Sequence, residues 1–199
     1  MILAVFSVLI GYLIGSIPFG LVLTQLAGLG DIRKIGSGNI GATNVLRTGR
    51  KDLALLTLIL DAGKAAFVAL IFKYFSGSDM LGLVSGVFAV IGHNYPVFLK
   101  FKGGKGVAST LGLMLAITPI VGVLTALTWL FMALTFRYSS LSALTALALA
   151  PIYALFFETP AVSLVYLFLT VLSFYRHKEN IKRILNGEES KIKLKGTKK

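Results

Sequence analysis

Stretches of about twenty apolar residues constrain this chain more than any other feature, because each can cross the hydrocarbon core of a bilayer as one helix. They run at roughly 2–29, 53–75, 80–99, 141–157 and 161–175. Only 14% of the residues are charged, whereas about a quarter are charged in an ordinary soluble domain. The chain is therefore predicted to be an all-α integral membrane protein.

The segment 107–136 is too long for one span and short for two. A single helix would measure about 45 Å against a hydrocarbon core of about 30 Å, while two helices would have roughly 15 residues each. Pro119 lies near its middle. Two short spans are favoured, because they put every basic cluster on one face, which the positive-inside rule makes cytoplasmic. The clusters are Arg33, Lys34, Arg47, Arg50 and Lys51, then Lys100, Lys102 and Lys105, then Arg137, and then the tail from Arg176.

The predicted topology has about seven helices, two of them short, with the N-terminus outside and the C-terminus cytoplasmic. The stretch Met1–Leu29 lacks the basic start of a signal peptide and is too long for its apolar core, so it is expected to remain as a span. One domain, 1–199, is predicted, with a flexible tail at 187–199. The segment from Lys178 is expected to be amphipathic or extended, and its lysine-rich end to lie against anionic lipid.

Charge and residue types narrow the possible functions. The formal net charge of +12 fits positive-inside topology and anionic lipid headgroups better than it fits nucleic acid. The chain has no cysteine, which excludes disulfides, thiolate metal sites and a cysteine nucleophile. Carboxylates and histidines are not clustered along the sequence, so no metal or other cofactor is expected.

The first predicted cytoplasmic loop, 36–47, reads GSGNIGATNVLR. Its glycines permit positive φ and let consecutive N–H groups converge on an anion. The run matches GxGxxG, but no strand precedes it, so a dinucleotide-binding site is rejected. A flexible turn is the alternative, although a turn seldom needs three glycines and two asparagines. The candidate anion ligands here are Ser37, Gly38, Asn39, Asn44 and Arg47.

The second predicted cytoplasmic loop, 92–110, reads GHNYPVFLKFKGGKGVAST and ends where the next helix begins. Gly103, Gly104 and Gly106 surround Lys105 at that helix N-terminus, where unpaired N–H groups and the helix dipole favour an anion. The run lacks the first glycine and the Ser/Thr of a Walker A loop. A basic loop that only obeys the positive-inside rule would not need the glycines. Phosphate binding is therefore predicted.

Asp61 and Lys64 lie three residues apart on one face of the second span. Charges at that depth are expensive, so both side chains should face the interior of the bundle or a watery cavity. Two interpretations stay open, an internal ion pair and a contact between Lys64 and an anionic substrate.

His93 and His177 are the two histidines, and both fall at cytoplasmic ends of predicted spans. A lone histidine is usually a structural hydrogen-bonding residue, but the position beside basic loops makes catalysis an equal alternative. Asn180 follows His177 at helical spacing and should share its face. Ser142 opens another span on the same side, where helix capping explains it as well as ligand contact does.

Over nearly its whole length the chain resembles the bacterial acyl-phosphate:glycerol-3-phosphate acyltransferase family (PlsY family). The shared motifs are GSIPFG at 15–20, GSGNIGATNVLR at 36–47, Asp61 with Lys64, GHNYPVFLKFKGGKGVAST at 92–110 and YRHKEN at 175–180. Ala65 stands where the family often has glycine. The resemblance implies a seven-helix fold in the bacterial inner membrane, with a cytoplasmic active site. It also implies acyl transfer from acyl phosphate to the 1-hydroxyl of sn-glycerol 3-phosphate, giving lysophosphatidic acid and phosphate in phospholipid biosynthesis.

That activity assigns roles to the candidate residues. Those expected to act in catalysis are Lys105, His177 and Ser142. Those expected to bind substrate or phosphate are Ser37, Gly38, Asn39, Asn44, Arg47, Lys64, His93, Asn94, Gly103, Gly104, Gly106 and Asn180. The expected partners are acyl phosphate, sn-glycerol 3-phosphate and membrane lipid, and no nucleic acid.

Two other classes of protein share parts of this pattern. A transporter or anion channel would also have intramembrane charges and glycine-broken helices, but the polar residues here gather on the cytoplasmic side, with little to complete a path outward. A membrane scaffold without activity would not need two glycine-rich anion loops. Both classes are therefore less favoured than an enzyme.

Overall fold

The computed structural model describes residues 2–192. The helices in order are α1 Ile2–Gly15, α2 Phe19–Leu26, η1 Ile32–Lys34, α3 Ala42–Val45, η2 Leu46–Thr48, α4 Lys51–Ser76, α5 Asp79–Asn94, η3 Val97–Leu99, α6 Val107–Ile117, α7 Pro119–Phe136, α8 Ser139–Phe157, α9 Pro160–Arg176 and α10 Lys178–Leu185. The chain forms two compact units, Met1–Gly122 (unit 1) and Val123–Lys199 (unit 2). That the two act as one domain stays a prediction.

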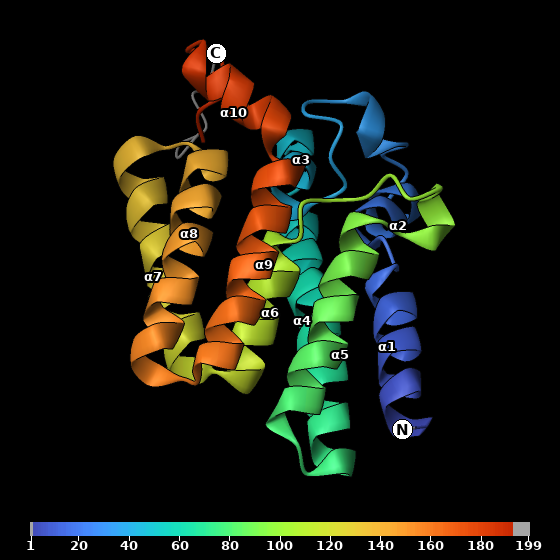
Figure 1. Cartoon of the computed structure of the whole chain (residues 1–199). Helices are drawn as coiled ribbons and strands as arrows, with labels where there is room; N and C mark the ends of the chain where they lie inside the picture. The colour runs from blue at the N-terminus through green and yellow to red at the C-terminus, as the bar shows by residue number, and fades with distance from the viewer. Residues whose placement is uncertain (1, 193–199) are drawn as a thin grey trace. The chain divides into compact units, whose positions relative to one another are not determined.

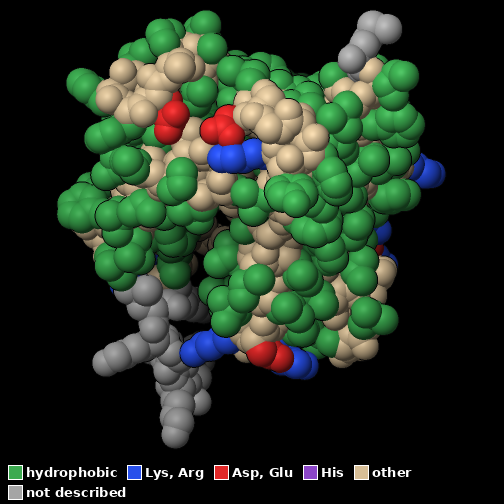
Figure 2. Space-filling model, turned by 90° about the horizontal axis from the view of Figure 1, so that it is seen from below, with side chains coloured by type: hydrophobic (Ala, Val, Ile, Leu, Met, Phe, Trp, Pro, Cys, Tyr) green, Lys and Arg blue, Asp and Glu red, His purple; other side chains and the backbone are tan. Residues whose placement is uncertain are grey.

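The helices have the length and composition of membrane spans. Among residues 2–192, five segments qualify by both, namely Ile2–Leu26, Lys51–Ser76, Asp79–Leu99, Pro119–Phe136 and Ser139–Phe157, while α6 and α9 are shorter apolar helices. Hydrophobic side chains cover most of the surface seen in Figure 2. A water-soluble protein rarely exposes so large an apolar surface. The prediction of an all-helical membrane protein is confirmed.

In unit 1, α1, α4, α5 and α6 lie side by side (Figure 1). Helix α1 runs parallel to α5, since Gly11 lies against Ser85 and Gly15 against Ala89. A side chain on either glycine would collide with the backbone of α5. Small residues let transmembrane helices approach closely enough to pack without a hydrophobic driving force.

The first apolar stretch is not one helix, as the run 2–29 had suggested. It breaks after Gly15 and resumes at Phe19, because Pro18 has no N–H to continue the hydrogen-bond ladder and disfavours helical backbone at Ile17. The break frees the Ile17 carbonyl, which accepts a hydrogen bond from Lys64 Nζ at 2.9 Å.

The predicted division of 107–136 at Pro119 is confirmed. Helix α6 ends at Ile117 and α7 begins at Pro119, a first helical position at which the missing N–H costs nothing. The polypeptide turns tightly here, because Gly122 lies against the backbone of Met114 and Leu115.

Helix α6 begins deep in unit 1. Ser109 Oγ, in its first turn, donates to the Asp61 carbonyl at 2.8 Å, and Asp61 lies ~15 Å along α4 from Lys51. The N-terminus of α6 therefore lies level with the middle of α4 and not with its start.

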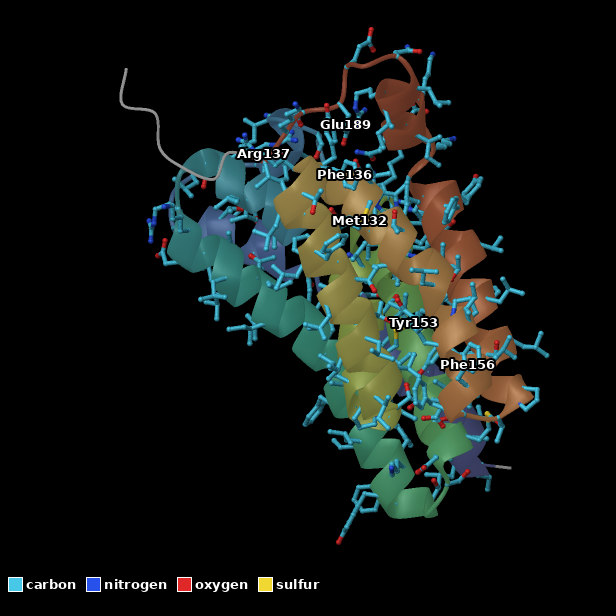
Figure 3. All side chains as sticks on the ribbon, turned by 90° about the vertical axis from the view of Figure 1, so that its left-hand side faces the viewer. Met132, Phe136, Arg137, Tyr153, Phe156 and Glu189 are labelled. Atoms are coloured by element: carbon cyan, nitrogen blue, oxygen red, sulfur yellow. The ribbon has the colours of Figure 1, made fainter. Side chains whose placement is uncertain are left out.

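Unit 2 contains most of α7 together with α8, α9 and α10. Pro151 inside α8 cannot donate to the Leu147 carbonyl, and Thr170 Oγ1 of α9 donates to it instead at 2.6 Å. Arg137 and Glu189 lie toward one end of this unit and Phe156 toward the other (Figure 3). The predicted amphipathic segment is the helix α10, while the lysine-rich end at 193–199 lies outside the described residues.

Candidate functional site

Asn44 organises the first loop. Its Nδ2 donates to the carbonyls of Ile32 (2.8 Å) and Asn39 (2.8 Å), and its Oδ1 accepts from the Ser37 N–H (3.1 Å). The side chain is buried. The loop is therefore a built structure, which argues against the flexible-turn alternative, and Asn44 shapes it from within.

A small hydrophobic core anchors this loop to the membrane helices. Its members are Leu21, Ile32, Ile40, Val45 and Ala54. Leu99, from the second loop, packs against the same core. The two glycine-rich loops are thus fixed to one another within unit 1.

The outer edge of the first loop presents the predicted anion ligands. Gly36 and Gly38 have φ of 55° and 68°, which glycine adopts without strain. Ser37 and Gly38 are exposed, and the Arg47 side chain lies against Gly36, where any side chain would collide with it. Glycine at 36 therefore leaves room for the Arg47 guanidinium at this edge of the loop.

The second loop packs tightly over the end of α5. The Gly104 N–H donates to the His93 carbonyl at 3.0 Å, and a side chain at Gly104 would overlap the His93 ring. Gly106, with φ of 77°, is the N-cap of α6. Lys105 is partly buried between these glycines, whereas Lys102 is exposed.

Asn94 lies under this loop with an amide that has no internal partner. The residue is 1% exposed, and neither Nδ2 nor Oδ1 has a hydrogen-bond partner among residues 2–192. Both atoms lie next to Gly106, at the N-terminus of α6. An unsatisfied buried amide costs about 1–3 kcal/mol, so its place beside a helix N-terminus favours a bound polar group there.

Lys64 is engaged inside the protein. Its Nζ lies 2.9 Å from Asp61 Oδ1, 2.9 Å from the Ile17 carbonyl and 3.0 Å from His93 Nδ1. An ammonium has three N–H donors, and these three acceptors match them. Of the two interpretations left open, the contacts favour the internal ion pair, and a substrate contact by Lys64 stays a prediction.

His177 and Asn180 lie where α9 meets α10 in unit 2. His177 is buried, and its Nδ1 lies 2.8 Å from the Ser173 carbonyl. A carbonyl can only accept, so Nδ1 carries the hydrogen and the neutral ring has its lone pair on Nε2. That is the form a general base requires.

Ser142 and Ser140 lie in the first turn of α8. Ser142 Oγ donates to the Tyr138 carbonyl of its own helix at 2.7 Å. This bond to the carbonyl four residues back engages the hydroxyl but is not a cap, so the capping alternative is wrong for Ser142, and its catalytic role stays a prediction. Ser140 Oγ instead donates to Glu189 Oε1 at 2.7 Å.

Glu189 is a residue that the sequence analysis missed. It also accepts from Asn180 Nδ2 at 2.7 Å and from Arg183 Nε at 2.7 Å. Burial raises the pKa of this carboxyl, but the hydrogen bonds from Ser140, Arg183 and Asn180 outweigh burial and hold the pKa below its usual value. The sequence signal that could have identified Glu189 is that it is an acidic residue in a basic tail, a few residues after Asn180.

Glu189→Gln should lower the apparent melting temperature of the detergent-solubilised protein by about 4–8 °C, the equivalent of ~2 kcal/mol. The amide would turn an N–H toward Arg183 or Asn180, where only an acceptor fits. Glu188→Gln, at an exposed neighbour, is the control and should leave the melting temperature unchanged.

The same network predicts a pH dependence. Because the folded-state pKa is lowered, the stabilisation is complete above the ordinary pKa of 4.5 and is lost as the pH falls through the lowered value. Thermal melts of wild type and Glu189→Gln should therefore converge on acidification. A gap that stays constant down to pH 3 would contradict this account.

The chain is similar to known acyltransferases over most of its length. A family model described as glycerol-3-phosphate acyltransferase matches residues 5–187. The glycerol-3-phosphate acyltransferase of Rhodospirillum rubrum is 58% identical, with 94% of this chain and 90% of that protein covered. The one of Maricaulis maris is 61% identical, with 92% and 84% covered.

Two crystal structures have the same fold. Both are of PlsY, an integral membrane glycerol 3-phosphate acyltransferase, one in its glycerol 3-phosphate form and one in its lysophosphatidic acid form. Each is 40% identical to this chain. The TM-scores are 0.89 and 0.86, with 96% and 94% of both chains covered.

Proposed function

Because this chain belongs to the PlsY family of glycerol-3-phosphate acyltransferases, we propose that it transfers a fatty acyl group from acyl phosphate to the 1-hydroxyl of sn-glycerol 3-phosphate. The products are lysophosphatidic acid and phosphate. The observation that carries the proposal is the N-terminus of α6, where Gly106, at the end of the Gly103–Gly106 loop that contains Lys105, lies next to the unsatisfied amide of Asn94. Such a site favours a phosphate oxygen.

The charge of the substrates suits the two anion loops. Both substrates carry phosphate, so the pocket has to hold several negative charges near low-dielectric walls. Lys105 and Arg47 supply positive charge, and the loop around Ser37 and Gly38 supplies backbone and hydroxyl donors. The reaction is proposed to need no metal or other cofactor.

The proposed mechanism is direct attack. The hydroxyl oxygen of glycerol 3-phosphate attacks the acyl carbonyl carbon, the bond from that carbon to the phosphate oxygen breaks, and phosphate leaves. The hydroxyl proton passes either to His177 Nε2 or to a phosphate oxygen of the substrate. The Ser173 carbonyl, 2.8 Å from His177 Nδ1, keeps the lone pair of the neutral ring on Nε2, and both choices stay open. Acyl phosphate is already activated, so a covalent enzyme intermediate would gain little.

Purified protein in detergent should convert acyl phosphate and glycerol 3-phosphate into lysophosphatidic acid, with sequential initial-rate kinetics. Enzyme incubated with labelled acyl phosphate alone should carry no label after denaturation. A labelled Ser37 or Ser142 that passes its acyl group to glycerol 3-phosphate would disprove direct attack. A protein with no activity toward acyl phosphate would disprove the proposed function.

We also propose that seven spans cross a bacterial inner membrane, with the N-terminus outside and the anion loops in the cytoplasm. The five long segments, α6 and α9 add up to this number, and the basic clusters determine the orientation. Asp79, at the opposite end of α4 from the loops, forms an ion pair with Lys73 at 2.9 Å.

Single cysteines test this topology, because the chain has none of its own. In intact cells a membrane-impermeant thiol reagent should label a cysteine at Asp79 and should not label one at Lys191. Both should react once the membrane is permeabilised. The reverse pattern in intact cells would place the anion loops outside.

A further inference from the structure

Three ionisable side chains form a closed cluster inside unit 1. Asp61, Lys64 and His93 are 2%, 4% and 4% exposed. They come from α4 and from the last turn of α5, and the freed Ile17 carbonyl between α1 and α2 completes the cluster. Ionisable residues at such depth are expensive to keep, and the direct attack proposed above gives none of the three a bond-making or proton-transfer step.

The hydrogen-bond donors of Lys64 determine the state of His93. An ammonium can only donate, so His93 Nδ1, at 3.0 Å from Nζ, has to accept. An imidazole whose Nδ1 accepts is neutral and carries its hydrogen on Nε2. A protonated His93 would instead aim an N–H at the ammonium, although Asp61 Oδ1 lies only 3.5 Å away. Lys64 is nearer and therefore decides the tautomer.

The other side of the His93 ring faces the second glycine loop. Nε2 is the atom nearest to the place where a Gly104 side chain would stand. The Gly104 N–H donates to the His93 carbonyl at 3.0 Å, so ring and backbone of His93 both contact the loop. A change in the orientation of His93 would therefore directly displace the residues that precede α6.

We infer that Asp61 and Lys64 are positioning residues for the Gly103–Gly106 loop. Asp61 orients the Lys64 ammonium, Lys64 fixes His93 as the Nε2–H tautomer, and His93 supports Gly104 from below. The buried ion pair also ties the break after α1 to α4, and Ser109 ties the start of α6 to the Asp61 backbone at 2.8 Å. The consequence for catalysis rests on the proposed function, but the tautomer does not.

Nitrogen-15 NMR of histidine-labelled protein tests the tautomer directly. The chain has two histidines, so a His177→Gln sample assigns the remaining signals to His93. In the wild type, His93 is expected to show a hydrogen on Nε2 and a bare Nδ1. In Lys64→Met, which keeps the length of the side chain but removes the donor, the Nδ1–H form should appear. A wild-type His93 that is protonated, or that carries its hydrogen on Nδ1, would overturn the inference.

A double variant separates positioning from folding. Removing one partner of a buried ion pair is strongly destabilising, whereas replacing both with apolar residues is often neutral. Asp61→Leu with Lys64→Met should therefore keep a melting temperature near that of the wild type, yet lose at least tenfold in kcat/KM, as for outer residues that orient active-site groups. Inorganic phosphate should also inhibit it more weakly.

The two ways of failing are distinguishable. If the double variant melts like the wild type and keeps its kcat/KM and its phosphate inhibition, the positioning role is wrong while the acyltransferase assignment stands. If the wild type itself has no acyltransferase activity, the proposed function fails, and the tautomer measurement still decides the state of His93. If the double variant does not fold, the spectra of the wild type and of Lys64→Met decide the inference alone.

Discussion

Lys105→Ala is expected to lower kcat/KM by on the order of a hundredfold or more, because it removes a preorganised positive donor from the position where phosphate charge develops. Lys105 lies between Gly104 and Gly106 at the N-terminus of α6 and is partly buried, so water screens its charge less than that of an exposed lysine. The measurement is steady-state kinetics with acyl phosphate and glycerol 3-phosphate varied in turn.

Lys102→Ala is the matched control for that substitution. It removes the same charge from the same loop, but Lys102 is exposed and its charge is screened by solvent. Its kcat/KM should stay within a few-fold of the wild type. Equal losses in the two variants would mean that the loop acts as a general basic surface and not as a shaped site.

Gly104→Ala should lower kcat/KM about as much as Lys105→Ala does. The cause is a change in geometry, because this substitution leaves the charge of the loop unchanged. A methyl group at this position overlaps the His93 ring, and His93 cannot move away because Lys64 Nζ holds its Nδ1 at 3.0 Å. The loop has to shift instead, and a displacement of about 1 Å in a positioning element can cost a hundredfold in rate. Kinetics together with inhibition by inorganic phosphate measure the loss.

Gly63→Ala supplies the control for the glycine substitution. Gly63 lies within α4 on an exposed face, and a side chain there would meet no atom within 4 Å. Alanine in a helix is favoured over glycine by up to ~1 kcal/mol, so this variant should be fully active and as stable as the wild type or more so. Wild-type activity in Gly104→Ala would show that the loop is not held against His93.

The sequence predicted the elements whose cause is local. Apolar runs of about twenty residues indicated the spans, and Pro119 indicated where 107–136 divides, as the structure confirms. The composition of the second loop pointed to an anion site before α6. Pro18 carried a similar signal for the break in the first span, but the apolar run continues through it and concealed the break.

The roles of individual polar residues could not be predicted in the same way. The side chain of Asn44, which was expected to bind phosphate, instead forms hydrogen bonds with backbone groups of Ile32, Asn39 and Ser37. Glu189, which was not predicted at all, accepts hydrogen bonds from Ser140, 49 residues away in the sequence, and from Arg183, 6 residues away. Neither assignment follows from composition, since each depends on which polar groups the fold places within hydrogen-bonding distance.

By itself, therefore, the sequence determined that this chain lies in a membrane, that 107–136 divides at Pro119 and which loops carry the positive charge. Transfer from water to lipid depends on the length and polarity of each segment, and these can be read one segment at a time. Only the tertiary structure decided that Lys64 meets Ile17 and His93, which lie 47 and 29 residues away. A buried donor bonds whichever acceptor the packing of the helices places about 3 Å away, and that packing is a property of the whole bundle.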